Sequence, residues 1–97
     1  MLDRSLLVPF VYILRCADGT LYTGIAKDLE QRLERHRRGK ASKYTRCRLP
    51  VTLAWKRRVM SWSRALKEEI RIKSLTRAQK EELLSLVIVV KKKRPRS

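Results

Sequence analysis

The stretch VYILRCADGTLYTGIAKDLEQRLERH, from Val11 to His36, decides the fold, because a hairpin signal in it runs directly into a helix signal. Asp18-Gly19 is a turn pair between two runs rich in β-branched and aromatic residues. The runs span residues 10–16 and 20–25. The stretch therefore predicts two antiparallel strands joined by a tight turn.

The loop length at this turn decides where the two tyrosines of the stretch point. A two-residue loop at Asp18-Gly19 places Tyr12 and Tyr22 on opposite faces of the hairpin. A three-residue loop that begins at Ala17, with its glycine left-handed, places both tyrosines on one face and sets Tyr12 opposite Gly24. Both loops suit these residues, and a shared site for the tyrosines requires the second.

The helix that follows carries two polar side chains on its apolar face. Asp28 is a good N-cap for LEQRLERHRR, and Gly39 suits the position just past its end. At about 100° per residue, Arg32 and His36 fall on the same face as the two leucines of this helix. An inward arginine costs free energy unless it has a partner or its guanidinium reaches water at the edge of the stripe.

The remainder of the chain predicts a third strand and two more helices. The strand VTLAWKRRV covers residues 51–59, after a basic loop GKASKYTRCRLP. Ser61 or Ser63 can cap a helix over about residues 62–74, and Thr76 can cap a last helix over residues 77–86. The fold class is therefore α+β, a small, mostly antiparallel three-stranded sheet flanked by helices in the order β-β-α-β-α-α.

The chain length and charge limit the possible functions. The 97 residues suit one domain, over residues 1–90, followed by a basic tail over residues 91–97 that we expect to be disordered. Lys and Arg number 25 against 9 Asp and Glu, a net charge of +16, which favours nucleic acid as the partner. The two cysteines, Cys16 and Cys47, are too few for a disulfide framework or a closed zinc site. No run is long enough to span a membrane, and there is no signal peptide, so we expect a cytoplasmic protein.

The second helix contains two adjacent glutamates that periodicity separates. An apolar stripe formed by Trp62, Leu66 and other apolar residues of this helix has Glu69 near its centre, whereas Glu68 falls on the solvent side. An inward carboxylate is paired with a cation or holds a metal. The alternative to a metal site is an ion pair between Glu69 and Lys73 at the rim of the sheet.

Taken together, these residues resemble the GIY-YIG nuclease superfamily. VYI and YTG stand where the family has its two namesake motifs, and Arg32 and His36 match the helix that follows. SRALKEEIRIK resembles the family's metal-binding helix and would place its glutamate at Glu69. KYT and RLPVTL resemble the small stand-alone, bacterial-type branch. The chain has no asparagine, which some branches use late in the domain, and it carries Ile25 where the excision-repair branch has a lysine. It also carries Ala26 where the stand-alone branch usually has a threonine.

The resemblance implies metal-dependent hydrolysis of a nucleic-acid phosphodiester, most simply in DNA. Glu69 would hold Mg²⁺ or Mn²⁺, and Arg32 would clamp the phosphoryl oxygens. Tyr12 or Tyr22 would deprotonate the attacking water, and His36 would orient a tyrosine or act as the base itself.

Further residues are expected to grip the nucleic-acid backbone rather than to read bases. No base-reading motif stands out in the sequence, so we expect selection of DNA shape rather than sequence. The alternatives are a DNA- or RNA-binding module without turnover, and a basic structural protein whose inward polar groups pair only with one another. The residues expected at the backbone are Lys40, Lys43, Tyr44, Arg46, Arg48 and Lys73.

Overall fold

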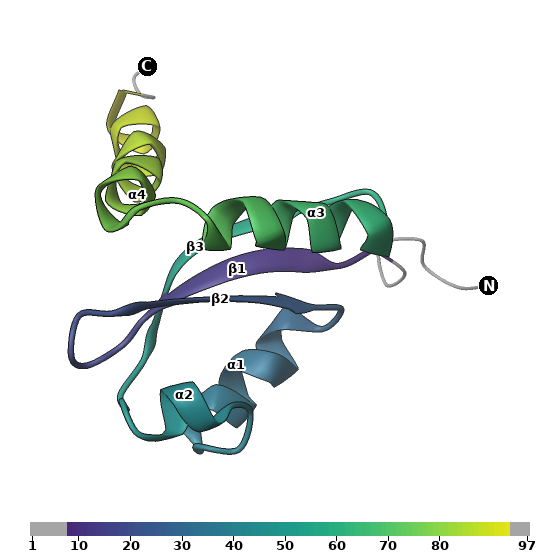
Figure 1. Cartoon of the computed structure of the whole chain (residues 1–97), viewed down its shortest axis with the longest axis vertical. Coiled ribbons are helices and arrows are strands. Elements are labelled where there is room, and N and C mark those ends of the chain that lie inside the picture. The colour runs from purple at the N-terminus through teal and green to yellow at the C-terminus, as the bar shows by residue number, and fades with distance from the viewer. Residues whose placement is uncertain (1–7, 94–97) are drawn as a thin grey trace.

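A computed structural model describes residues 8–93, with side-chain surroundings described for residues 8–85. The predicted α+β class and its element order are confirmed, with one short helix in addition (Figure 1). That helix, α2, occupies the basic loop and has a single turn, too short for any periodicity to indicate it. The elements are β1 (Phe10–Arg15), β2 (Leu21–Ala26), α1 (Leu29–Arg37), α2 (Lys43–Arg46), β3 (Thr52–Arg58), α3 (Trp62–Lys73) and α4 (Arg77–Lys93).

The sheet is antiparallel with the strand order β2-β1-β3, so β1 is central and both other strands are edges. Helices α1 and α2 lie on one face of the sheet and α3 on the other (Figure 1). Alternate residues of β1 serve the two faces: Tyr12 and Leu14 pack with the leucines of α1, whereas Val11 and Ile13 pack with α3 and α4. The sheet therefore has a small hydrophobic core on each side.

The hairpin has the three-residue loop. Gly19 adopts a positive φ of 86°, and the backbone N–H of Cys16 donates to the carbonyl of Thr20 at 2.9 Å. Tyr12 consequently lies opposite Gly24 in the ladder. This register places the two tyrosines on one face, which is the arrangement that a shared site requires.

The helix boundaries follow the caps expected from the sequence. The Asp28 carboxylate accepts from the backbone N–H of Gln31, and Ser61, not Ser63, caps α3. Thr76 and Gln79 cap the start of α4 reciprocally, each side chain accepting from the other residue's backbone N–H.

The buried face of α3 differs from the one expected. Ala65 and Ile72 are buried, whereas Trp62, Leu66 and Ile70 are 44%, 51% and 67% exposed. The helix thus rests on the sheet through a small residue and one isoleucine, and its larger apolar residues remain outside. Hydrophobicity alone does not distinguish these faces, because it registers the size of an apolar side chain and not the space that the sheet offers.

The prediction that Glu68 lies on the solvent side was wrong. Its side chain is 16% exposed, against 20% for Glu69, because the helix is rotated so that Glu68 faces the β3 edge. Its carboxylate pairs there with Arg57 of β3.

The last helix is longer than expected. It runs to Lys93 and so includes the first three residues of the segment expected to be a disordered tail, whereas residues 94–97 lie outside the described residues. Arg15 at the end of β1 holds the helix through two hydrogen bonds to Glu81, each 3.0 Å long. Within the described part of the chain, no helix combines the length and hydropathy needed to cross a membrane.

Candidate active site

Tyr12 and Gly24 fit together across the β1–β2 ladder. A Cβ added at Gly24 would lie 2.5 Å from the Tyr12 hydroxyl oxygen and 2.7 Å from the ring carbon that carries it. The tyrosine ring therefore crosses directly over the strand where no side chain stands. This close approach gives the glycine of the YTG motif a physical role.

The hydroxyl of Tyr12 meets His36 of α1 in a buried hydrogen bond. The Tyr12 hydroxyl and the His36 Nε2 are 2.9 Å apart, and the other ring nitrogen, Nδ1, lies 2.9 Å from the Thr45 hydroxyl. Thr45 in turn donates to the Ser42 carbonyl, at 3.4 Å. This chain of bonds assigns the proton to Nδ1 and makes Nε2 the acceptor for Tyr12.

Burial keeps both members of this pair neutral. Desolvation, followed by the charge of Arg32, lowers the pKa of His36 from 6.5 to about 4. Desolvation also raises the pKa of Tyr12 to about 12, and the charge of Arg32 offsets this in part. At pH 7 the folded protein therefore holds an uncharged imidazole and a protonated phenol.

Tyr22 is the more accessible of the two tyrosines. Its side chain is half-buried, and its ring packs edge-on to His36 with the centroids 5.4 Å apart. The other side of the ring stacks on Tyr44 of α2, at 5.8 Å and 28°. Tyr22 is thus held from both sides while remaining partly open to solvent.

Two residues expected at the nucleic-acid backbone make contacts within the protein. The guanidinium of Arg48 lies 3.9 Å from the centre of the Tyr44 ring, and its Nε donates to Asp18 at 3.1 Å. Arg48 also donates to the Tyr44 carbonyl at 2.9 Å. These contacts tie the hairpin turn to the loop behind Tyr22, so Tyr44 and Arg48 position that tyrosine.

The other basic-loop residues remain at the surface. Lys40, Lys43 and Arg46 are exposed and line a shallow cleft of about 230 Å³ beside α2. Their contact with a phosphate backbone stays a prediction. Cys16 and Cys47 are both free thiols.

Thr45 is the site residue that sequence reasoning missed. It is fully buried and bonds His36, yet it sits on a helix of one turn. The sequence offered one signal, because Ser42, three positions earlier, is a residue type that caps helices. That signal indicates a helical turn at Thr45 but not its hydrogen bond to His36.

Glu69 lies on α3, on the opposite side of the sheet (Figure 1). Its negative charge raises the pKa of Tyr12, as the smallest of the effects on that hydroxyl. It also forms an ion pair with Lys73 at 3.1 Å, the alternative considered from the sequence. Direct contacts thus gather Tyr12, Tyr22 and His36 on one face of the sheet. The charges of Arg32 and Glu69 act on Tyr12.

The donor chemistry of this site fits a hard divalent cation held loosely. No group of three or more His, Cys, Asp or Glu side chains suited to a metal occurs among the described residues. Among the described residues, Glu69 is the one carboxylate whose charge acts on Tyr12. Mg²⁺ is commonly held by one or two carboxylates together with waters and substrate phosphates, so a single glutamate suits such an ion.

Comparison with known proteins establishes the class. The sequence model of the GIY-YIG catalytic domain matches residues 8–82, and the chain therefore belongs to the GIY-YIG family of nucleases. Within that family it is similar to a UPF0213 protein of Staphylococcus aureus, with 49% identity over 75 residues that cover 77% of this chain and 92% of the relative. The relative is itself a small stand-alone protein, which agrees with the branch that the sequence indicated.

Two solved structures share the fold. A UPF0213 protein from Bacillus halodurans has 42% identity and a TM-score of 0.55, over 81% of this chain and 84% of that one. A protein from Enterococcus faecalis has 36% identity and a TM-score of 0.59, over 84% and 88% of the two chains.

Proposed function

We propose that this chain is a divalent-metal-dependent endonuclease that hydrolyses DNA phosphodiester bonds and selects DNA by shape rather than by sequence. The observation that supports this proposal most strongly is the gathering of two tyrosines and an arginine around one buried imidazole, with the charge of Glu69 also acting on Tyr12. The net charge of +16 suits a polyanionic substrate.

The two tyrosines take different roles in this proposal. Tyr12 is protonated and donates to His36, so the pair holds the hairpin against α1. Tyr22 is partly open to solvent and is therefore the phenol that meets the attacking water.

Arg32 and Glu69 act on the phosphate. The guanidinium of Arg32 binds the phosphoryl oxygens, where negative charge develops in the transition state. Glu69 would hold Mg²⁺ or Mn²⁺, which when bound would supply Lewis-acid polarisation of the phosphate and stabilisation of the leaving oxygen. Lys73 lies beside this carboxylate and adds a second positive charge.

Cleavage of branched and linear DNA tests the proposal. We expect incision with Mg²⁺ or Mn²⁺, none with EDTA, and a loss of at least about a hundredfold in Glu69→Gln. Glu30→Gln, which removes an exposed carboxylate of α1, is the matched control and should cut at the wild-type rate. Salt-sensitive DNA binding without incision in either metal would refute the proposal.

A nucleic-acid-binding module without turnover is the second candidate. The observation that favours it is the ion pair between Glu69 and Lys73, which occupies the carboxylate without a metal. In that case Mg²⁺ would leave the thermal unfolding temperature of the wild type unchanged. The endonuclease predicts that Mg²⁺ raises this temperature in the wild type and not in Glu69→Gln.

A further inference from the structure

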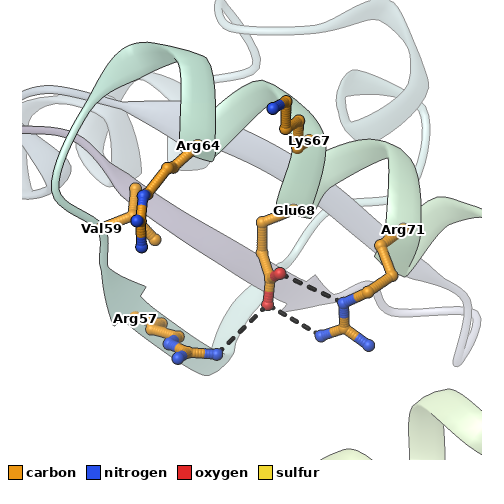
Figure 2. A pocket seen from close by; sticks show the side chains of 6 residues that line it. All are labelled: Arg57, Val59, Arg64, Lys67, Glu68 and Arg71. Carbon is orange, nitrogen blue, oxygen red and sulfur yellow. Dashed lines mark hydrogen bonds and ion pairs between the residues drawn. The ribbon is translucent and has the colours of Figure 1, made fainter.

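A second cationic cleft lies on the β3 side of α3, away from the candidate active site. It has a volume of about 420 Å³ and is formed by the end of β3, the following loop and one flank of α3 (Figure 2). Its walls carry four cations and a single carboxylate. The lining residues are Arg57, Val59, Arg64, Lys67, Glu68 and Arg71.

Glu68 fixes two of the four cations in place. One carboxylate oxygen accepts from the Nε of Arg71 at 3.1 Å, and the other accepts from Arg71 at 2.8 Å and from Arg57 at 3.4 Å (Figure 2). These bonds, that of Arg71 first, lower the pKa of Glu68, so it is ionised at neutral pH. The guanidiniums are therefore oriented before any ligand arrives, and most of the donors of Arg57 remain available.

Arg64 and Lys67 add charge that Glu68 does not balance. Both project from the exposed part of α3 beside the cleft, and among the described residues neither forms an ion pair (Figure 2). One carboxylate against four cations leaves the cleft strongly positive. Like charges gathered in one hollow repel each other and raise its affinity for anions.

The cleft and the candidate active site face opposite edges of the sheet. Glu68 and Glu69 are adjacent, so they lie about 100° apart around α3. Glu68 pairs with Arg57 of the β3 edge, whereas Glu69 influences Tyr12, which lies opposite Gly24 of the β2 edge. A strand that crosses α3 would meet both sides of one helix.

We propose that this cleft binds a phosphate of the nucleic-acid backbone, separate from the phosphate at the candidate active site. Paired, pre-oriented guanidiniums are the donors that suit phosphate oxygens best. The assignment rests on the proposed function for the position of the first phosphate, but its binding can be measured without cleavage.

Salt-dependent binding tests the cleft. Arg64→Gln/Lys67→Gln is placed in the Glu69→Gln background, and the dissociation constant for a fluorescein-labelled branched DNA is measured over a range of NaCl concentrations. The control, Arg35→Gln/Arg37→Gln, removes the same charge from the exposed face of α1, across the sheet. We expect the slope of log K against log salt to fall by about one to two in the cleft variant, and by less than half of that in the control. Equal slopes in the two variants would overturn the assignment.

The source of the phosphate needs a separate measurement. Amide chemical shifts of Arg64, Lys67 and Glu68 are followed with inorganic phosphate, a mononucleotide, polyglutamate and the DNA. Inorganic phosphate should change these amide shifts weakly and saturably, and DNA should displace it. That result supports a site for a backbone phosphate. A mononucleotide or polyglutamate that holds the cleft against DNA overturns it.

The failures of the two proposals are distinguishable. Cleavage by the wild type together with equal salt slopes in the cleft and control variants refutes the cleft alone. A selective loss of salt slope in the cleft variant, with no cleavage under any condition, refutes the nuclease alone.

Discussion

Tyr12 and Tyr22 share one face of the hairpin but differ in what surrounds their hydroxyls. Tyr12 is fully buried and bonded to His36, whereas Tyr22 is half-buried against the rings of His36 and Tyr44. Periodicity predicted that Arg32 and His36 point inward, and both do, because helix geometry determines direction. It could not assign the roles of the tyrosines, because these depend on burial by residues far away in the sequence.

Replacing each tyrosine by phenylalanine separates these roles. Tyr12→Phe leaves the Nε2 of His36 buried without its donor, so the free energy of unfolding should fall by about 1–2 kcal/mol. Tyr22→Phe removes a partly solvated hydroxyl, so stability should change by less than about 0.5 kcal/mol while cleavage falls at least about a hundredfold. Urea denaturation and single-turnover cleavage measure the two effects. The reverse pattern, with Tyr12→Phe silent in stability, would contradict the assignment.

The low pKa of His36 makes stability depend on pH. The unfolded chain takes up the proton near pH 6.5 and the folded one only near pH 4, so stability falls as the pH drops through this window. The loss between pH 7 and pH 5 should be about 2 kcal/mol in urea denaturation. The carboxylates with lowered pKa, such as Glu81, stabilise the fold above about pH 4.5 and lose this contribution only as the pH falls further. They therefore do not account for the loss of stability between pH 7 and pH 5.

A direct check uses the single imidazole of the chain. Its proton resonance should titrate in the folded protein with a midpoint near 4. A midpoint near 6.5 in the folded protein would show that the imidazole is solvated and the hydrogen-bond chain absent.

At the level of elements, the sequence predicted what local rules control. The strands, the N-caps and the left-handed Gly19 and Gly39 follow from turn and capping chemistry. Helix α2 has a single turn and no period, so it could not be predicted. The buried face of α3 was wrong because three of its larger apolar residues lie outside and Ala65 makes the contact.

Two glycines of the hairpin test the register in different ways. Gly24→Ala pushes a Cβ into the Tyr12 ring, so it should cost about 1–3 kcal/mol, abolish cleavage and raise the pKa of His36 toward its ordinary value. Gly19→Ala meets no atom within 4 Å but strains a positive φ, so it should cost about 1 kcal/mol and leave cleavage intact. Urea denaturation measures the stability cost, a cleavage assay measures activity, and the imidazole titration measures the pKa of His36. Equal effects of the two substitutions on cleavage would contradict the role of Gly24.

At the level of the whole molecule, the candidate site joins parts from both sides of the sheet. The hairpin and α1 bring Tyr12, Tyr22 and His36 together on one face. Glu69 of α3, on the other face, acts on Tyr12 through its charge. Periodicity predicted which face of its own helix or strand each residue occupies. That these residues form one site was predicted only from the resemblance to a family. The net charge of +16 was visible in the sequence, but the cleft around Glu68 was not, because it needs β3 and α3 side by side.

The location of a bound Mn²⁺ ion tests the central claim most directly. Crystals of the protein with a DNA that resists cleavage are grown with Mn²⁺, and the ion is located by its anomalous scattering. We predict one peak about 2.2 Å from a carboxylate oxygen of Glu69, with Lys73 displaced from its ion pair and Arg32 on the adjacent phosphate. A peak at Glu68, or Glu69 still paired with Lys73 in the presence of Mn²⁺ and DNA, would contradict the account.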